Sequence, residues 1–272
     1  AVFTYANQLD LPGQPLPADD GLYLAYLDVW LRGVTFLERP ELREEALAGP
    51  DTGYRVQTLG QVKLLRVDDV TALNGNINPL APLHDNSANW QNLQAASTGA
   101  LTARTAAAAT TSDPCVIGEE GGYVLQDNTL YRVEIHKSGP AGTATFKWSR
   151  NNATVASEVL EIAGSNITVR DIGRDRGQSF QPGQWLEIID EGLELEERRG
   201  TLVQILEVNG NSLFIDPNNI LHYDDAKNNQ AEAVAVELSD FPRGRVRIRR
   251  WDVDNTRGEI DVPADDTFVD LE

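Results

Sequence analysis

The 272-residue sequence contains no methionine and a single cysteine, Cys115. One cysteine excludes a disulfide within the chain, and with it a small secreted scaffold that depends on disulfides. Cys115 follows Asp-Pro in a turn-like context without the features of an activated nucleophile, so we expect it to be inert. Because translation starts at methionine, the alanine at position 1 predicts that the chain was processed or is a piece of a longer protein.

Positive charge is also scarce. The chain has 42 acidic and 23 basic residues, which gives a formal net charge of -19. Nucleic-acid binding depends on a positive surface and on counterion release, so this balance argues against a nucleic-acid partner. Apolar runs fall well short of the roughly 20 residues that a membrane-spanning helix needs, so no membrane span is predicted. With 41% hydrophobic residues, the composition is that of a globular protein.

Motifs that carry chemistry are missing as well. The sequence has no GxxxxGK phosphate loop, no GxSxG nucleophile elbow and no HExxH zinc motif, and its histidines are far apart. Acidic pairs such as Asp19 and Asp20 suit the two carboxylates of a glycosidase, but so acidic a chain produces such pairs by chance. No catalytic residue is assigned, and a polysaccharide hydrolase is the second alternative for the function.

Short strand-like segments dominate what is present. Turn signals recur at intervals of roughly 8–12 residues after Leu130, and Asn209 and Gly210 supply hairpin turn chemistry. The run from Leu22 to Trp30 is apolar at nearly every position, which is typical of a strand covered on both faces. The predicted fold class is therefore all-β, with a β-sandwich-like N-terminal part, a small β-barrel-like part and few short helices. We expect more than about one third strand and no helix longer than about four turns.

Three parts are predicted along the chain. Residues 1–21, which contain several prolines, form an extended arm. Residues 22–164 form the β-sandwich-like domain, interrupted by a long polar loop at about 73–114. Residues 165–272 form the small β-barrel-like domain. A two-turn helix is expected after Pro40, because proline suits the first turn of a helix.

An arginine stripe is expected on one face of the last predicted strand. Its members are spaced by two, which on a strand places them on one face; they are Arg243, Arg245, Arg247 and Arg249. One interpretation is an internal ladder of arginine and carboxylate pairs. The other is a docking face for an acidic partner chain or a polyanionic glycan, so the stripe is a candidate partner-binding site.

A second strand-like segment alternates in the same way. Arg132, Glu134 and His136 share one face, and the residues between them are apolar. This pattern predicts a half-buried sheet whose polar face is in solvent.

The tryptophans fall into two groups. Trp30, Trp148, Trp185 and Trp251 are flanked by strand-like apolar residues and are expected to be mostly buried. Trp90 lies in the polar loop and is expected to be the most exposed of the five. An exposed aromatic ring can stack on a sugar, so Trp90 is a candidate residue for a glycan-binding β-module, the first alternative for the function.

One segment offers ligands for a metal ion. The sequence DVDNTRGEID, residues 252–261, contains oxygen ligands of the kind that calcium takes, and the candidates are Asp252, Asp254, Asn255 and Glu259. The segment is not an EF-hand, because its glycine is one position later than that loop requires. A plain polar turn is the alternative, and no other cofactor is predicted.

Several long blocks of the sequence occur in a recognisable order. They are YLDVWLRGVTFLERPELREEALAGPDTGYRVQTLGQVKLL, DNTLYRVEIHKSG, ATFKWSRNNATV, PGQWLEIIDE and RIRRWD. In this order and spacing, from about Tyr23 to Trp251, the chain resembles an uncharacterised bacterial family whose genes often lie beside clusters for phage-tail-like contractile injection systems. The family provides no catalytic residues to carry over.

The resemblance implies a non-catalytic structural or accessory component of a larger particle, such as a baseplate, fibre or anchor. The partners expected are other protein subunits, including further copies of the chain itself, with glycans as the alternative. Neither a nucleic acid nor a membrane span is expected.

Overall fold

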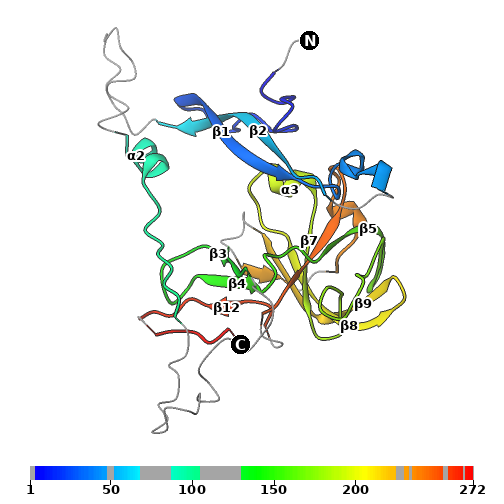
Figure 1. Cartoon of the computed structure of the whole chain (residues 1–272). Coiled ribbons are helices and arrows are strands. Elements are labelled where there is room, and N and C mark those ends of the chain that lie inside the picture. Colours follow the sequence, from blue (N-terminus) through cyan, green and yellow to red (C-terminus); the bar gives the residue numbers. More distant parts are fainter. Residues whose placement is uncertain are drawn as a thin grey trace, which may run out of the picture. The chain divides into compact units, whose positions relative to one another are not determined.

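The computed structural model describes residues 4–47, 52–67, 87–104, 130–224, 230–232, 235–253, 257–265 and 267–271. It is 40% strand and 10% helix, so the predicted all-β class with few short helices is confirmed (Figure 1). The longest helix in this part of the chain, α2 (Ala88–Gln94), has 7 residues.

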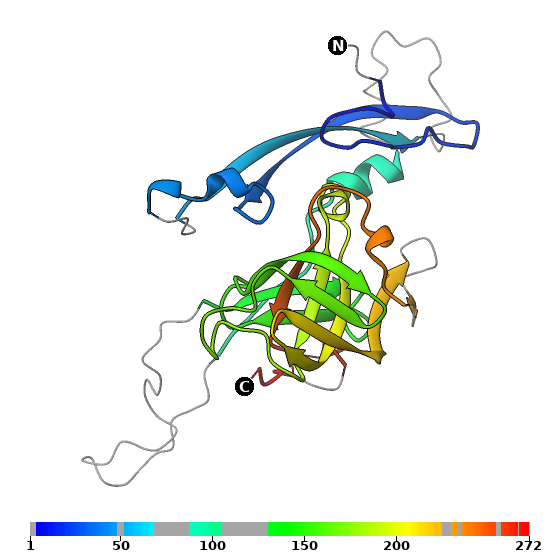
Figure 2. The same cartoon turned by 90° about the vertical axis from the view of Figure 1, so that its right-hand side faces the viewer.

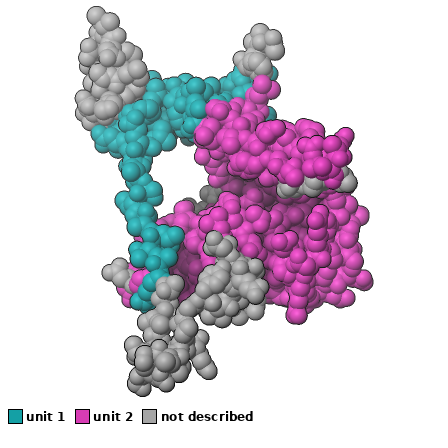
Figure 3. All heavy atoms as spheres, in the orientation of Figure 1, with its two compact units in different colours: residues 1–8, 12–29, 60–128 teal, residues 9–11, 30–59, 129–272 magenta. Residues whose placement is uncertain are grey.

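The chain divides into two compact units (Figure 3). Unit 1 contains residues 1–8, 12–29 and 60–128, and unit 2 contains residues 9–11, 30–59 and 129–272. Two strands, β1 (Tyr23–Val34) and β2 (Arg55–Arg66), run through both units and pair with each other. We call this pair the ribbon, and Figure 2 shows its two strands side by side.

The ribbon corrects one prediction. β1 was expected to be covered on both faces, but the side chains of Leu27 and Val29 are 64% and 56% exposed. In unit 1 the opposite face contributes Leu24, which packs with Leu65 against the buried Val67. The strand is therefore apolar on both faces although only one of them packs within the described chain.

The short helix α2 lies inside the segment predicted to be a loop. Ser87 precedes it, and the Ser87 side chain accepts a hydrogen bond from the backbone N–H of Trp90 at 3.2 Å. The Asn89 amide donates to the carbonyl oxygen of Arg66 at the end of β2, at 2.9 Å. Most of the remaining predicted loop lies outside the described residues.

Six strands of unit 2 form a closed barrel in the order β9-β6-β5-β11-β7-β8, with β8 pairing back to β9. Every neighbouring pair is antiparallel. A short strand, β10 (Gln230–Glu232), pairs with β9 beside the barrel. The barrel strands are β5 (Ala156–Ala163), β6 (Asn166–Val169), β7 (Trp185–Ile189), β8 (Thr201–Asn209), β9 (Ser212–Asp224) and β11 (Arg247–Trp251).

Tight hairpins set the barrel's boundaries. β8 and β9 pair Asn209 with Ser212, so Gly210 lies in a two-residue turn, where its φ of 57° is easily reached. β5 and β6 are joined by a similar turn at Gly164, with a φ of 60°. The predicted start of the barrel-like part at residue 165 falls inside this second hairpin, because the turn separates two strands of one barrel.

A three-stranded sheet completes unit 2, in the order β12 (Ile260–Asp261), β4 (Thr145–Ser149) and β3 (Arg132–Lys137). Trp148 of this sheet joins Trp185 and Trp251 of the barrel in one buried cluster. The barrel interior is a separate core that includes Phe180 and Ile248. The rings thus connect the small sheet to the barrel wall.

Short helical turns occupy the connections. The predicted two-turn helix after Pro40 appears as two separate 3-10 turns, Pro40–Leu42 and Glu45–Leu47. Another 3-10 turn spans Leu238–Asp240. Helix α3 (Glu191–Leu195) begins after Asp190, whose carboxylate accepts a hydrogen bond from the backbone N–H of Leu193 at 2.7 Å.

Candidate interaction surface

The ribbon carries an exposed apolar face in unit 1. We define the apolar ribbon face as Leu27 and Val29 of β1 together with Gly60 and Val62 of β2, since side chains two residues apart lie on the same face of a strand. Leu27, Val29 and Val62 are 64%, 56% and 39% exposed. Along the two strands the same alternation continues at two further exposed residues, Leu31 and Val56.

The apolar ribbon face is uneven. Among the described residues, apart from its chain neighbours, a Cβ atom on Gly60 would meet only Leu27 Cδ1 within 4 Å, at 3.8 Å. In the described chain the face therefore has a ridge at Leu27 and Val29 beside a hollow at Gly60. It also lacks charge, because the positions that flank it on the same side are Ala25 and Leu64.

The other side of the ribbon holds the polar contacts. Lys63 Nζ lies 2.6 Å from a carboxylate oxygen of Asp28. The Trp90 ring of α2 meets Tyr26 edge-on, with ring centroids 6.4 Å apart. These contacts orient the strands so that their charged side chains face away from the apolar ribbon face.

The edge of β2 is blocked at its centre. The side-chain amide of Gln8 donates to the carbonyl oxygen of Val62 at 2.9 Å and accepts from the backbone N–H of Val62 at 2.7 Å. Both backbone groups of Val62 are thereby occupied, as they would be by a neighbouring strand. Gln8 itself is 9% exposed, so the arm predicted to be extended is held against the strand here.

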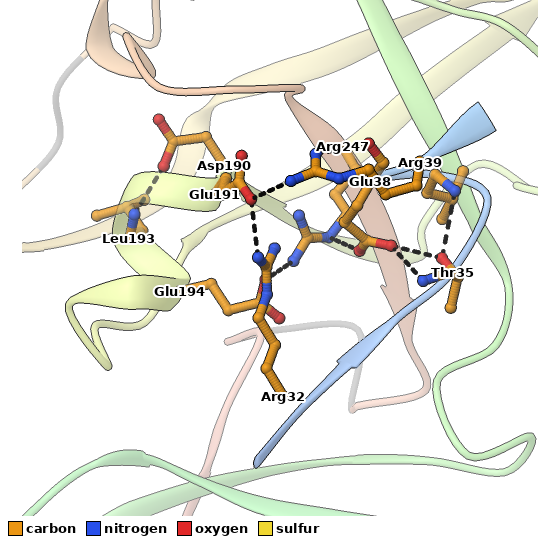
Figure 4. Close-up of polar contacts among 10 residues, drawn as sticks. Arg32, Thr35, Glu38, Arg39, Asp190, Glu191, Leu193, Glu194 and Arg247 are labelled. Carbon is orange, nitrogen blue, oxygen red and sulfur yellow. Dashed lines mark hydrogen bonds and ion pairs between the residues drawn. The ribbon is translucent and has the colours of Figure 1, made fainter. Parts of the chain in front are cut away.

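In unit 2, the end of β1 is tied to the barrel by a buried charge cluster (Figure 4). Arg32 Nη1 lies 2.8 Å from Glu191 Oε1, and Arg32 Nη2 lies 2.6 Å from Glu194 Oε2. Arg247 of β11 reaches Glu194 at 2.7 Å and Glu38 at 3.2 Å. The backbone N–H and hydroxyl of Thr35 each donate to Glu38 at 2.7 Å. We call these residues the arginine clamp; they are Arg32, Glu38, Glu191, Glu194 and Arg247.

Two members of the arginine clamp, Arg32 and Glu38, have shifted pKa values that favour their ionised forms. Burial alone would lower the pKa of Arg32, but its hydrogen bond to Glu191 and the charge of Glu194 raise that pKa above its ordinary value. Burial alone would raise the pKa of Glu38, but the charge of Arg247 and the hydrogen bonds from Thr35 hold it below its ordinary value. The clamp therefore has the properties of a structural ion cluster.

A second buried network lies where β4 meets the barrel. Lys147 Nζ is 2.6 Å from Glu187 Oε1, and the ammonium group sits over the Trp251 ring at 4.4 Å. Glu187 also accepts hydrogen bonds from Trp251 Nε1 at 2.9 Å and from the backbone N–H of Gly200 at 3.0 Å. Burial would raise the pKa of Glu187, but the charges of Lys147 and His136 lower it well below its ordinary range.

Tyr223 occupies a related buried position in unit 2. Its hydroxyl donates to Glu259 Oε1 at 2.5 Å, and the other carboxylate oxygen of Glu259 accepts from the Thr145 hydroxyl at 2.7 Å. The Arg199 guanidinium lies over the Tyr223 ring at 4.5 Å. Burial and the hydrogen bond to Glu259 raise the pKa of Tyr223 above its ordinary value.

Residues 88–272 match the family of unknown function DUF6519. The chain belongs to this family. No curated protein and no solved structure matches the chain. The matched residues contain the complete barrel and the three-stranded sheet, whereas both strands of the ribbon lie outside them.

The arginine stripe is paired inside this DUF6519 chain. Arg243 reaches Glu196 at 2.8 Å, and Arg245 pairs with Glu158. Arg247 belongs to the arginine clamp, and Arg249 is half-buried. The pairs of Arg243, Arg245 and Arg247 agree with an internal ladder, and the docking role of the stripe stays a prediction.

The expectation that the whole stripe lies on one strand is wrong. β11 begins at Arg247, so Arg243 and Arg245 precede it. The cause is Gly244, whose φ of 72° turns the chain between them.

Three of the five tryptophans are fully buried, as predicted: Trp148, Trp185 and Trp251. Trp30 and Trp90 are both partly buried, so Trp90 is more exposed than those three, and its order relative to Trp30 stays a prediction. Trp90 lies on α2, not in an open loop, because Ser87 caps a helix there, and its role in glycan binding stays a prediction.

Two of the candidate calcium ligands, Asp252 and Glu259, accept hydrogen bonds from different parts of the chain. Asp252 accepts hydrogen bonds from the backbone N–H of Arg150 at 2.8 Å and from the Ser149 hydroxyl at 3.2 Å. Glu259 is occupied by Tyr223 and Thr145, as described above. Asp254 and Asn255 lie outside the described residues, as does Cys115. In the described part of the chain, no group of three or more acidic, histidine or cysteine side chains is placed to hold a metal ion.

The prediction for β3 is wrong at His136 and Ile135. His136 was expected on a solvated face, but it is buried, whereas Ile135 is 60% exposed. The polar face turns inward because it meets the buried network: Glu134 lies 3.6 Å from Lys147, and the His136 ring packs edge-on against Tyr223. Among the described residues, no helix is both long and apolar enough to cross a membrane.

Neither the clamp nor the buried network was found from the sequence. Arg32 and Glu194 are 162 positions apart, and no local pattern links such residues. The apolar ribbon face was visible in the sequence, because β1 is apolar on both faces. A two-stranded ribbon that packs on one side requires apolar residues on only one face, so the second apolar face indicates a further contact.

Proposed function

We propose that this DUF6519 protein is a non-catalytic structural or accessory component of a larger particle, and that the apolar ribbon face is its contact surface for other subunits. The observation that carries the proposal is the combination of Leu27 and Val29, each more than half exposed, on a face without charge. The type of particle is suggested by the resemblance to proteins encoded beside phage-tail-like contractile injection systems.

Exposed apolar side chains next to one another favour an interaction surface. Single exposed apolar residues are normal, whereas a row of them beside polar residues marks a contact site. A two-stranded sheet is marginally stable in water unless further strands or a helix cover its apolar side. Among the described residues of unit 1, α2 and Val67 supply such contacts on one side of the ribbon, so a partner on the other side would stabilise it.

The buried ionisable groups support a structural role. A general acid or base works best when its pKa lies near the working pH. The pKa of Glu187 is held far below that range and the pKa of Tyr223 is raised far above it. The partners of both groups are parts of the same fold, which fits residues that hold the three-stranded sheet to the barrel.

Sedimentation of the native protein tests the proposal. In cells that naturally produce the protein, the tagged protein is expected to sediment with a large particle that electron microscopy can show, and not as a free single chain. A Val29→Glu chain should be depleted from that fraction, because burying a charge in an apolar contact is costly. A wild-type chain absent from every large particle would contradict the proposed function.

The matched control is Leu206→Glu. Leu206 is 62% exposed and lies on β8 of the barrel, away from the ribbon strands in the sequence and in the sheet order. Leu206→Glu introduces the same charge as Val29→Glu at a similarly exposed side chain, so the Leu206→Glu chain is expected to stay in the particle fraction.

A further inference from the structure

We propose that the apolar ribbon face is covered by a second copy of this chain, packed face to face about a two-fold axis. This inference rests on the proposed function and names the partner of the same surface. Three properties of the face support it: the absence of charge, the shape of the face and the blocked edge of β2.

Charge decides where two copies can meet. Each chain carries a formal net charge of -19, so most contacts between two copies bring like charges together. The apolar ribbon face, from Ala25 and Leu27 across to Val62 and Leu64, has no charged side chain. Lys63 and Asp28, the charged residues between these positions, pair with each other on the opposite side of the ribbon. Two copies can therefore approach through this face without juxtaposing charges.

The face is also complementary to itself. The ridge at Leu27 and Val29 lies on β1, and the hollow at Gly60 lies on β2. A two-fold axis through the ribbon places the ridge of each copy over the hollow of the other, so that every contact occurs twice. Two sheets packed in this way lie about 10 Å apart with interdigitated side chains.

The blocked edge favours packing of faces over addition of a strand to β2. A partner strand at that edge would need the backbone N–H and C=O of Val62, and the Gln8 amide already bonds both of them. The exposed side chains of the face remain available in the same chain. A second two-stranded ribbon would cover them and supply the further strands that a stable sheet structure requires.

Sedimentation velocity of the purified full chain over a wide range of concentration tests the inference. The expected result is a concentration-dependent equilibrium between the 29.9 kDa chain and a species of twice that mass. Val29→Glu should raise the dissociation constant of the dimer by roughly 100-fold or more, because the two-fold axis buries the new charge twice. Leu206→Glu, at a residue 62% exposed on the barrel, should change the constant by less than about twofold.

A second variant acts through shape. Gly60→Val adds a β-branched residue to a strand position where, among the described residues outside its chain neighbours, only Leu27 Cδ1 lies within 4 Å of the new Cβ. The single chain should therefore be as stable as the wild type or slightly more stable. In the dimer it fills the hollow that receives the partner's ridge, and the dissociation constant should rise by roughly 10-fold. Thermal unfolding of the same samples shows that both variants fold.

The outcomes separate this inference from the proposed function. A wild-type chain that stays at 29.9 kDa at all concentrations overturns the second-copy inference, even if the chain occurs in a large particle. A dimer that neither Val29→Glu nor Gly60→Val weakens overturns it too. A dimer that forms as expected, from a protein that never sediments with a particle, leaves the inference in place and removes the proposed function.

Discussion

Lys147 Nζ lies 2.6 Å from Glu187 Oε1 in the interior of unit 2, and the two side chains are only 3% and 4% exposed. This pair connects β4 of the three-stranded sheet with β7 of the barrel. Because both charges are buried, each is tolerated only in the presence of the other.

Removing the cation should therefore be more costly than removing the pair. Lys147→Met leaves Glu187 as an uncompensated buried carboxylate, and we expect a loss of about 3–5 kcal/mol in the free energy of unfolding. The double variant Lys147→Met with Glu187→Gln retains an acceptor for Trp251 Nε1 and should recover part of this loss. Urea unfolding measures both values, and a single variant no less stable than the double variant would contradict the prediction.

Glu187 should also make the protein sensitive to acid. Its pKa in the folded chain lies below its ordinary value of 4.5, so the unfolded chain binds more protons between the two pKa values. The stabilisation is present above pH 4.5 and is lost as the pH falls toward the folded pKa. The free energy of unfolding of the wild type should fall more steeply on acidification than that of Glu187→Gln. Parallel curves from urea unfolding at each pH would be inconsistent with this explanation.

The arginine clamp gives a matched pair of variants. Arg247 is 2% exposed and contacts Glu38 and Glu194, so Arg247→Met should destabilise the protein by about 3–5 kcal/mol. Arg170 pairs with Glu158 but is 51% exposed, so Arg170→Met should cost at most about 1 kcal/mol. Equal losses in denaturant unfolding would show that burial does not determine the contribution of these pairs.

Gly258 lies in the segment that the sequence suggested as a calcium site, and packing explains why this position is a glycine. A Cβ atom there would lie 2.5 Å from Trp185 Cε3, and the residue has a φ of 71°. Gly164 has a similar φ of 60°, but no described residue other than its chain neighbours lies within 4 Å of its Cβ position. Gly258→Ala should therefore lower the melting temperature clearly more than Gly164→Ala, because both substitutions strain the backbone and only one collides with a ring. Equal melting temperatures would remove packing as the reason for this glycine.

Local patterns were sufficient to predict much of the barrel. The hairpin at Gly210 follows from turn chemistry, and the burial of Trp185 and Trp251 follows from their strand-like neighbours. β3 shows where such reasoning fails, because a polar alternation cannot reveal which side meets the protein. On its polar side His136 is buried against Tyr223 and Glu134 lies near Lys147, contacts that only the folded chain creates.

The ribbon shows a different limit. A run that is apolar on both faces predicts a strand between two layers, and the sequence of β1 cannot tell whether both layers belong to the same chain. The described chain packs one side of the strand and leaves Leu27 and Val29 exposed. The arginine clamp could not be predicted from the sequence either, because Arg32 and Glu191 are 159 positions apart.

Assembly of the protein should cover the apolar ribbon face. Hydroxyl-radical footprinting of the particle fraction and of the dilute free chain measures this directly. Labelling of Leu27, Val29 and Val62 should fall on assembly, while Leu206 of the barrel, which is 62% exposed in the single chain, stays labelled. Equal labelling of Leu27 and Val29 in the free and the assembled protein would contradict the claim.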